Sequence, residues 1–101
     1  MKIQKIKDKV GQITLRLGRE EILATGLFGS LARGDFDEGS DIDIFVITEK
    51  EIPLREQDEL YFAFSELIPG FGRDITVLVY DIVFPHNICV VRENYAAIEK
   101  A

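Results

Sequence analysis

The segment from Gly29 to Val46 constrains the fold of this chain more than any other part of the sequence. It reads Gly-Ser-Leu-Ala-Arg-Gly-Asp-Phe-Asp-Glu-Gly-Ser-Asp-Ile-Asp-Ile-Phe-Val. A small-residue turn is followed by an acidic loop and then by alternating residues that are typical of a strand. Side chains two positions apart on a strand point to the same face, so Asp41 and Asp43 share a face.

The strand expected over residues 41–48 has two unlike faces. One face is apolar throughout: Ile42, Ile44 and Val46. The other begins with the two carboxylates and continues with Phe45 and Ile47. A strand whose outer face meets solvent along its whole length would stay polar to its end. The change from carboxylate to apolar predicts that the aspartates lie at the mouth of a covered face, where a cleft would form.

These residue types suit a phosphate-bearing ligand with divalent cations. The Cα atoms of two residues at i and i+2 on a strand lie about 6.6 Å apart, at about 3.3 Å rise per residue. Carboxylates at this spacing can share a pair of hard cations about 3.5–4 Å apart. A Gly-Ser turn that opens a helix lets backbone N–H groups approach phosphate oxygens. The segment therefore predicts a site for a nucleoside triphosphate on magnesium.

The spacing of apolar residues predicts the other elements. Helices are expected over 3–17, 31–33 and 54–67, strands over 22–29, 41–48 and 74–80, and a helix with a short terminal strand over 87–99. Ser30 is expected to cap the short helix. In the helix over 54–67, the residues expected to face the core are Leu60, Tyr61, Phe64, Leu67 and Ile68, and Pro69 to Gly72 are expected to end it.

Composition and length limit the class of protein. The chain has 101 residues, of which 47% are hydrophobic, enough for one domain over 1–101 with a single core. No apolar run is long enough to span a membrane, and the N-terminus is too polar for a signal peptide, so we expect a cytoplasmic protein. The single cysteine, Cys89, excludes an internal disulfide and is expected to be buried.

The charge balance argues against a long nucleic acid as partner. Twelve basic and eighteen acidic residues give a net charge of −6. A negative protein repels a phosphate backbone at long range.

The motif resembles the signature of the DNA polymerase beta-like nucleotidyltransferase superfamily. Gly29-Ser30, ten intervening residues and Asp41-Ile42-Asp43 carry the resemblance, and the length is similar to that of its minimal nucleotidyltransferase branch. The resemblance implies an α+β fold in which helices flank a mixed β-sheet of three or more strands.

The resemblance also implies an activity and a set of site residues. Asp41, Asp43 and Asp74 would bind two Mg2+ ions, with Asp74 completing the site and helping to activate the acceptor. Gly29 and Ser30 would bind the triphosphate. An acceptor hydroxyl would then receive a nucleoside monophosphate, with AMP from ATP favoured, and pyrophosphate would leave.

Some positions keep two interpretations. Arg33 is placed to reach a phosphate, but it can equally pair with Asp35 or Asp37. Ser40 is a nucleotide-binding candidate that also suits a turn before Asp41.

Other residues have an ordinary structural explanation beside the functional one. Arg73 can pair with Asp74, His86 suits a loop, and Arg92 and Tyr95 would close near the nucleotide only by analogy with the family. The aromatic residues Tyr61, Phe62 and Phe64 fit a core or an interface better than a base-stacking platform.

The residues of the motif do not specify the acceptor or the partner. Small proteins of this resemblance are commonly the antitoxin of a pair with a HEPN-domain toxin, and some transfer AMP to a toxin tyrosine. A homodimer is another possible source of the missing binding surface. The alternative function is a non-catalytic module that binds nucleotide or neutralises a partner by contact, and an Asp43→Asn variant would separate the two.

Overall fold

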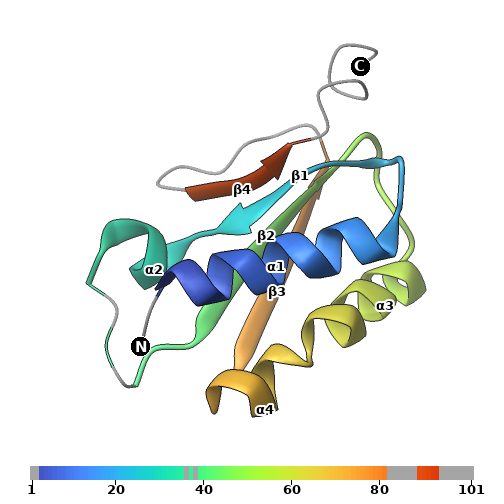
Figure 1. Cartoon of the computed structure of the whole chain (residues 1–101). Helices are drawn as coiled ribbons and strands as arrows, with labels where there is room; N and C mark the ends of the chain where they lie inside the picture. Colours follow the sequence, from blue (N-terminus) through green and yellow to red (C-terminus); the bar gives the residue numbers. More distant parts are fainter. Residues whose placement is uncertain (1–2, 36, 38, 82–88, 94–101) are drawn as a thin grey trace.

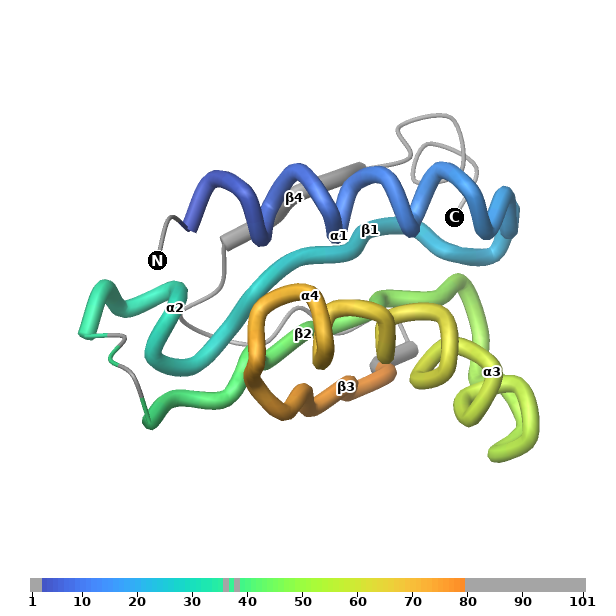
Figure 2. The backbone as a smooth tube through the Cα atoms, turned by 60° about the horizontal axis from the view of Figure 1, so that its bottom comes forward, coloured from blue at the N-terminus to red at the C-terminus, as the bar shows by residue number. Residues whose placement is uncertain are grey.

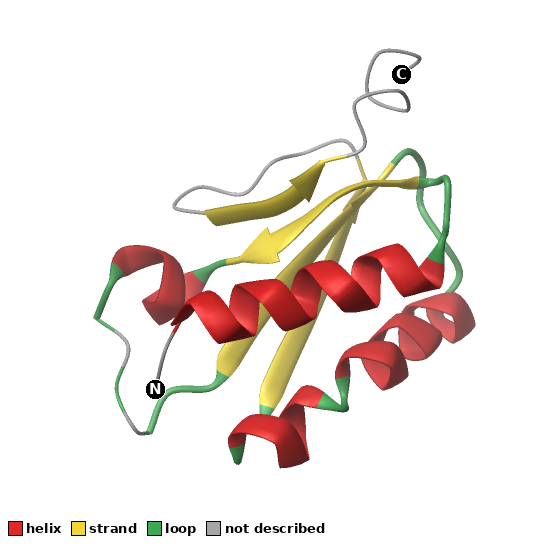
Figure 3. Ribbon diagram, viewed as in Figure 1, coloured by secondary structure: helices red, strands yellow, loops and turns green. Residues whose placement is uncertain are grey.

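The computed structural model describes residues 3–35, 37, 39–81 and 89–93, and within them a four-stranded sheet with helices on one face (Figures 1 and 3). The helices are α1 (Ile3–Leu17), α2 (Gly29–Arg33), α3 (Leu54–Phe64) and α4 (Leu67–Phe71). The strands are β1 (Ile22–Leu27), β2 (Ile42–Thr48), β3 (Ile75–Asp81) and β4 (Cys89–Glu93). None of the helices in these ranges has the length and apolar content needed to cross a bilayer.

The strand order in the sheet is β3-β2-β1-β4. β2 and β3 run parallel, whereas β1 is antiparallel to both of its neighbours, β2 and β4. The parallel pair is possible because α3 and α4 form the crossover between β2 and β3. The prediction of an α+β fold with a mixed sheet flanked by helices is therefore confirmed.

One face of the sheet packs against α1, α3 and α4, which lie side by side across it (Figures 1 and 2). The predicted apolar face of β2 forms the middle of this core, and all three of its residues are fully buried. They pack with Ile6 and Val10 of α1 and with Leu60 and Phe64 of α3. The predicted stripe of α1 and the predicted face of β2 thus meet in one hydrophobic core.

A second, smaller cluster occupies the opposite face of the sheet. It consists of Leu23, Ala24, Phe45 and Ile47, with Phe28 packed against it. Phe45 and Ile47 are fully buried, while Asp43 on the same face of β2 is half-buried and Asp41 is exposed. The prediction that this face changes from carboxylate to covered apolar residues is confirmed.

The single helix expected over residues 54–67 is wrong, because two helices are present. α3 ends at Phe64, and a turn at Ser65, whose N–H bonds the carbonyl of Phe62, separates it from α4. Pro69 does not end a helix but lies in the first turn of α4, where its missing N–H is not needed. Tyr61 is 40% exposed rather than directed into the core.

The boundaries near the predicted motif also shift. Ser30 does not cap α2, since Gly29 is already the first helical residue and Phe28 stands at the cap position without a side-chain hydrogen bond. The strands expected from Asp41 and from Asp74 each begin one residue later.

For residues 87–99, the described part is strand β4 rather than a helix. The burial expected for Cys89 lies outside what the structure describes.

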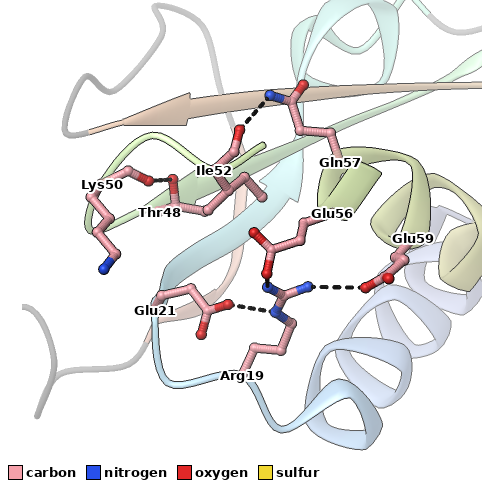
Figure 4. A network of polar contacts seen from close by, with 8 residues as sticks. All are labelled: Arg19, Glu21, Thr48, Lys50, Ile52, Glu56, Gln57 and Glu59. Carbon is pink, nitrogen blue, oxygen red and sulfur yellow. Dashed lines mark hydrogen bonds and ion pairs between the residues drawn. The ribbon is translucent and has the colours of Figure 1, made fainter. Parts of the chain in front are cut away.

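Arg19 fixes the end of the sheet at which β1 begins (Figure 4). Its guanidinium contacts Glu21, bonds Glu56 Oε1 of α3 at 2.9 Å and lies 3.7 Å from Glu59 Oε2. Nearby, the Thr48 hydroxyl donates to the carbonyl of Lys50 at 2.7 Å, and Gln57 donates to the carbonyl of Ile52 at 3.0 Å. These contacts join the ends of β1 and β2 to the start of α3.

Candidate functional site

Gly29 and Asp43 approach each other closely where β1 leads into α2. The N–H of Phe28 donates to the carbonyl of Asp43 at 3.0 Å, which extends the pairing of β1 and β2 to this point. Gly29 has φ of +65°, and a Cβ built there would lie 2.3 Å from Asp43 Oδ2. The missing side chain is therefore required for the Asp43 carboxylate to lie where it does, and the positive φ independently favours glycine at this turn.

The environment of Asp43 disfavours its own negative charge. Burial raises the pKa of the Asp43 carboxyl, and the neighbouring Asp41 carboxylate raises it further. A hydrogen bond from Thr76 and the charge of Arg33 oppose this rise in pKa without cancelling it. A divalent cation would remove the repulsion, so the carboxylate pair of Asp41 and Asp43 fits Mg2+.

We expect the raised pKa of Asp43 to contribute a loss of stability to the metal-free protein as pH rises. The folded state holds a proton on Asp43 more tightly than the unfolded state does, so the contribution of this group to the free energy of unfolding falls from pH 3.8 upward through the raised pKa. Asp43→Asn should remove this part of the pH dependence and be at least as stable as the wild type at neutral pH. Urea unfolding between pH 4 and pH 7 in EDTA measures it. A variant that is less stable at neutral pH would contradict the prediction.

Asp74 lies at the same end of the sheet but next to Asp41 rather than Asp43. Its carbonyl accepts a hydrogen bond from the N–H of Ile42 at 2.9 Å, and its side chain is exposed. In the part of the chain that the structure describes, no three His, Cys, Asp or Glu side chains gather into a group that could hold a metal ion. Of the two other aspartates, Asp41 is the one whose charge acts on Asp43.

Arg33 is near the aspartates and also paired. Its Nε lies 3.3 Å from Asp35 Oδ2, so the ion-pair interpretation of Arg33 is confirmed. Both side chains are more than half exposed, and such pairs contribute little to stability. The same guanidinium charge acts on Asp43, so Arg33 lies near enough to influence the site electrostatically.

Ser40 serves as a turn residue in the loop before Asp41. Its hydroxyl accepts a hydrogen bond from the N–H of Asp37 and donates to Asp37 Oδ1, both at 3.1 Å. The Arg73 guanidinium bonds the carbonyls of Asp37 at 2.6 Å and Ser40 at 2.7 Å. Arg73 therefore anchors the loop that leads into the two aspartates.

We expect Arg73→Met to loosen this loop. Losing two hydrogen bonds from a charged donor should lower the free energy of unfolding by about 1–2 kcal/mol. Arg55→Met, at an exposed position of α3, is the matched control and should have little effect. Urea unfolding of the two variants gives the comparison, and equal losses would show that the contacts of Arg73 with the loop contribute nothing.

The opposite end of the sheet is unsuited to a nucleotide. A hollow of about 650 Å³ there is lined by Glu20, Glu21, Glu49, Lys50, Glu51, Ile52, Pro53 and Glu56. Five of these eight side chains are glutamates, which would repel a triphosphate.

Phe64 is fully buried in the core, and Tyr61 and Phe62 meet edge to face on the exposed side of α3, with their ring centroids 6.3 Å apart. Arg92 belongs to β4. His86 and Tyr95 lie outside the described residues.

No sequence pattern assigns Thr76 or Arg73 to this region. Thr76 lies two residues after Asp74, so the alternation of an extended chain places both on one face, and that is the signal the sequence offers. The contacts of Arg73 span 33 and 36 residues of sequence, so no local pattern could indicate them.

Comparison with known proteins assigns the class. The family model for the nucleotidyltransferase domain matches residues 3–100. This chain therefore belongs to the nucleotidyltransferase domain family, which confirms the resemblance to a minimal nucleotidyltransferase.

Particular relatives agree with this assignment. "Putative protein adenylyltransferase MJ0435" of Methanocaldococcus jannaschii is 33% identical over 85 residues, 84% of this chain and 85% of that protein. "Putative protein adenylyltransferase MJ0141" of the same organism is 30% identical over 69 residues, 68% of this chain and 70% of that protein. A crystal structure of a toxin-antitoxin with AMP-PNP shares the fold, with a TM-score of 0.64 and 19% identity over 93% of this chain and 78% of that chain.

Proposed function

We propose that this protein is a Mg2+-dependent nucleotidyltransferase that moves AMP from ATP to a hydroxyl group of a partner protein. The observation that carries the proposal is the half-buried Asp43 carboxylate, held against Gly29 and raised in pKa by burial and by Asp41. Such a carboxylate is stabilised when it binds a cation. Membership of the nucleotidyltransferase family and the two named relatives support this chemistry.

Each site residue has a proposed role in the reaction. Asp41 and Asp43 would hold the magnesium, which would neutralise charge on the phosphate oxygens during the transfer. Gly29 and Ser30 are assigned to the triphosphate by their place in the family motif. Asp74, at the edge of the site beside Asp41, is assigned to the acceptor side.

The transfer itself exchanges one phosphorus–oxygen bond for another. The acceptor oxygen bonds the α-phosphorus of ATP, the bond from that phosphorus to the oxygen of the β-phosphate breaks, and pyrophosphate leaves. The hydroxyl proton passes to a nearby carboxylate or to water. Holding the two reactants in line is itself worth several powers of ten in rate.

The partner and the acceptor are proposed by comparison with proteins of similar fold. A solved toxin-antitoxin with AMP-PNP has this fold, so we propose a toxin partner of the HEPN type, with a tyrosine hydroxyl as acceptor. The exposed aromatic pair Tyr61 and Phe62 on α3 lies on the surface available to a partner.

The test is transfer of label from α-labelled ATP. The purified protein is incubated with Mg2+ and a lysate of its source cells, alongside Asp43→Asn. A labelled protein band that requires Asp43 would support the proposal and identify the acceptor. If no band is labelled while both proteins capture the same partner, the alternative applies, and the chain is a module that neutralises a partner by contact.

A further inference from the structure

Thr76 is the residue of β3 that lies directly beside Asp43. The two are partners in the parallel register of β2 and β3, and residues paired in this way share a face of the sheet. On that face the Thr76 side chain is within hydrogen-bonding reach of the Asp43 carboxyl, and this interaction lowers the pKa of that carboxyl. Asp43 is thus confined from two sides, by Thr76 on one strand and by the backbone of Gly29 on the other.

No carboxylate occupies the corresponding place on β3. Asp74 comes two residues before Thr76, so the Cα atoms of the two residues are about 6.6 Å apart in the extended chain. Asp74 is exposed. Its backbone pairs with β2 at Ile42, one residue before Asp43. The absence of a three-carboxylate group among the described residues agrees with this register.

A neutral donor at this place has a physical advantage over a third carboxylate. Asp43 is already half-buried beside Asp41, and another negative group in contact would add repulsion. A hydroxyl satisfies one lone pair of the carboxylate and leaves its charge and its other lone pairs for a cation.

We infer that Thr76 is a positioning residue: its hydroxyl, in place of a third carboxylate, holds Asp43 in the orientation that binds the divalent cation. The inference rests on the proposed function, because it concerns the same cation. Through this hydrogen bond Thr76 governs the affinity for the metal.

The test is direct binding of Mn2+, followed by its electron paramagnetic resonance signal in the whole protein without nucleotide. Loss of a hydrogen-bonding neighbour of a metal ligand typically weakens metal binding 10–100-fold, so Thr76→Val should bind Mn2+ about tenfold more weakly. Thr76→Ser, which keeps the hydroxyl, should bind within about twofold of the wild type. Asp74→Asn should lose less affinity than Thr76→Val.

Each outcome decides between the proposals. If Thr76→Val binds Mn2+ as well as the wild type does, or if Asp74→Asn is the weaker of the two, the inference is overturned and the proposed function stands. If the wild type itself binds no Mn2+, the proposed function and this inference both fail. Urea unfolding checks that the variants fold, and the Ser variant keeps the test valid if the Val variant does not.

Discussion

Replacing Asp43 with asparagine is expected to slow nucleotidyl transfer by about 10³-fold, which is about 4 kcal/mol of transition-state stabilisation. Asparagine has nearly the size of aspartate and can still accept a hydrogen bond from Thr76, so the packing against Gly29 is kept. What the variant loses is the negative charge that binds the cation in the proposed function. The loss should therefore appear in kcat as well as in kcat/KM.

The measurement is the steady-state rate of pyrophosphate release with a fixed acceptor. Asp58→Asn, which removes an exposed carboxylate of α3, is the control for the change in net charge and should retain the wild-type rate. An Asp43→Asn variant with a rate within tenfold of the wild type would mean that this carboxylate does not hold the catalytic cation.

The Asp43→Asn substitution should affect catalysis and stability in opposite directions. Because burial and Asp41 raise the pKa of Asp43, we expect the metal-free fold to be more stable when this group is neutral. The same substitution should therefore impair catalysis while sparing or improving the stability of the metal-free protein. A residue retained only for structure would show the opposite pattern.

The sequence predicted the parts of the fold that depend on strong local periodicity. The helix over 3–17 and the unlike faces of β2 are confirmed because each follows one period without interruption. The break between α3 and α4 is not predicted, because apolar residues continue at helical spacing across Ser65 and because a proline at position 69 suggests a helix end rather than a first turn.

The site was predictable only in so far as its residues are neighbours in sequence. The segment that contains Gly29 and Asp43 indicated a common site, and the structure places these two residues in contact range. Which residue of β3 lies beside Asp43 depends on the register of two parallel strands, and that register is set by the crossover through α3 and α4. Local sequence therefore indicates Asp74 as the neighbour of the two aspartates, whereas the tertiary structure places Thr76 beside Asp43.

Gly29→Ala is expected to abolish transfer, because it places a methyl group where the Asp43 carboxylate lies. The added Cβ would be 2.3 Å from Asp43 Oδ2, so either the carboxylate or the turn must move. The substitution also puts a side chain on a left-handed residue, at a cost of about 1–2 kcal/mol. We expect at least a 10²-fold loss of rate, since small displacements of reacting groups have effects of this size.

Gly18→Ala separates these two effects. Gly18 has φ of +59°, close to the +65° of Gly29, but the atom nearest to a Cβ added there is the carbonyl oxygen of Leu15 at 4.0 Å. It follows α1 and precedes β1, whereas Gly29 follows β1, so it lies at the opposite end of that strand. Both variants should therefore unfold at lower urea concentrations than the wild type, and only Gly29→Ala should lose transfer and Mn2+ binding. If Gly18→Ala lost activity to the same extent, backbone strain would explain the result, and the contact between Gly29 and Asp43 would have no special part in the site.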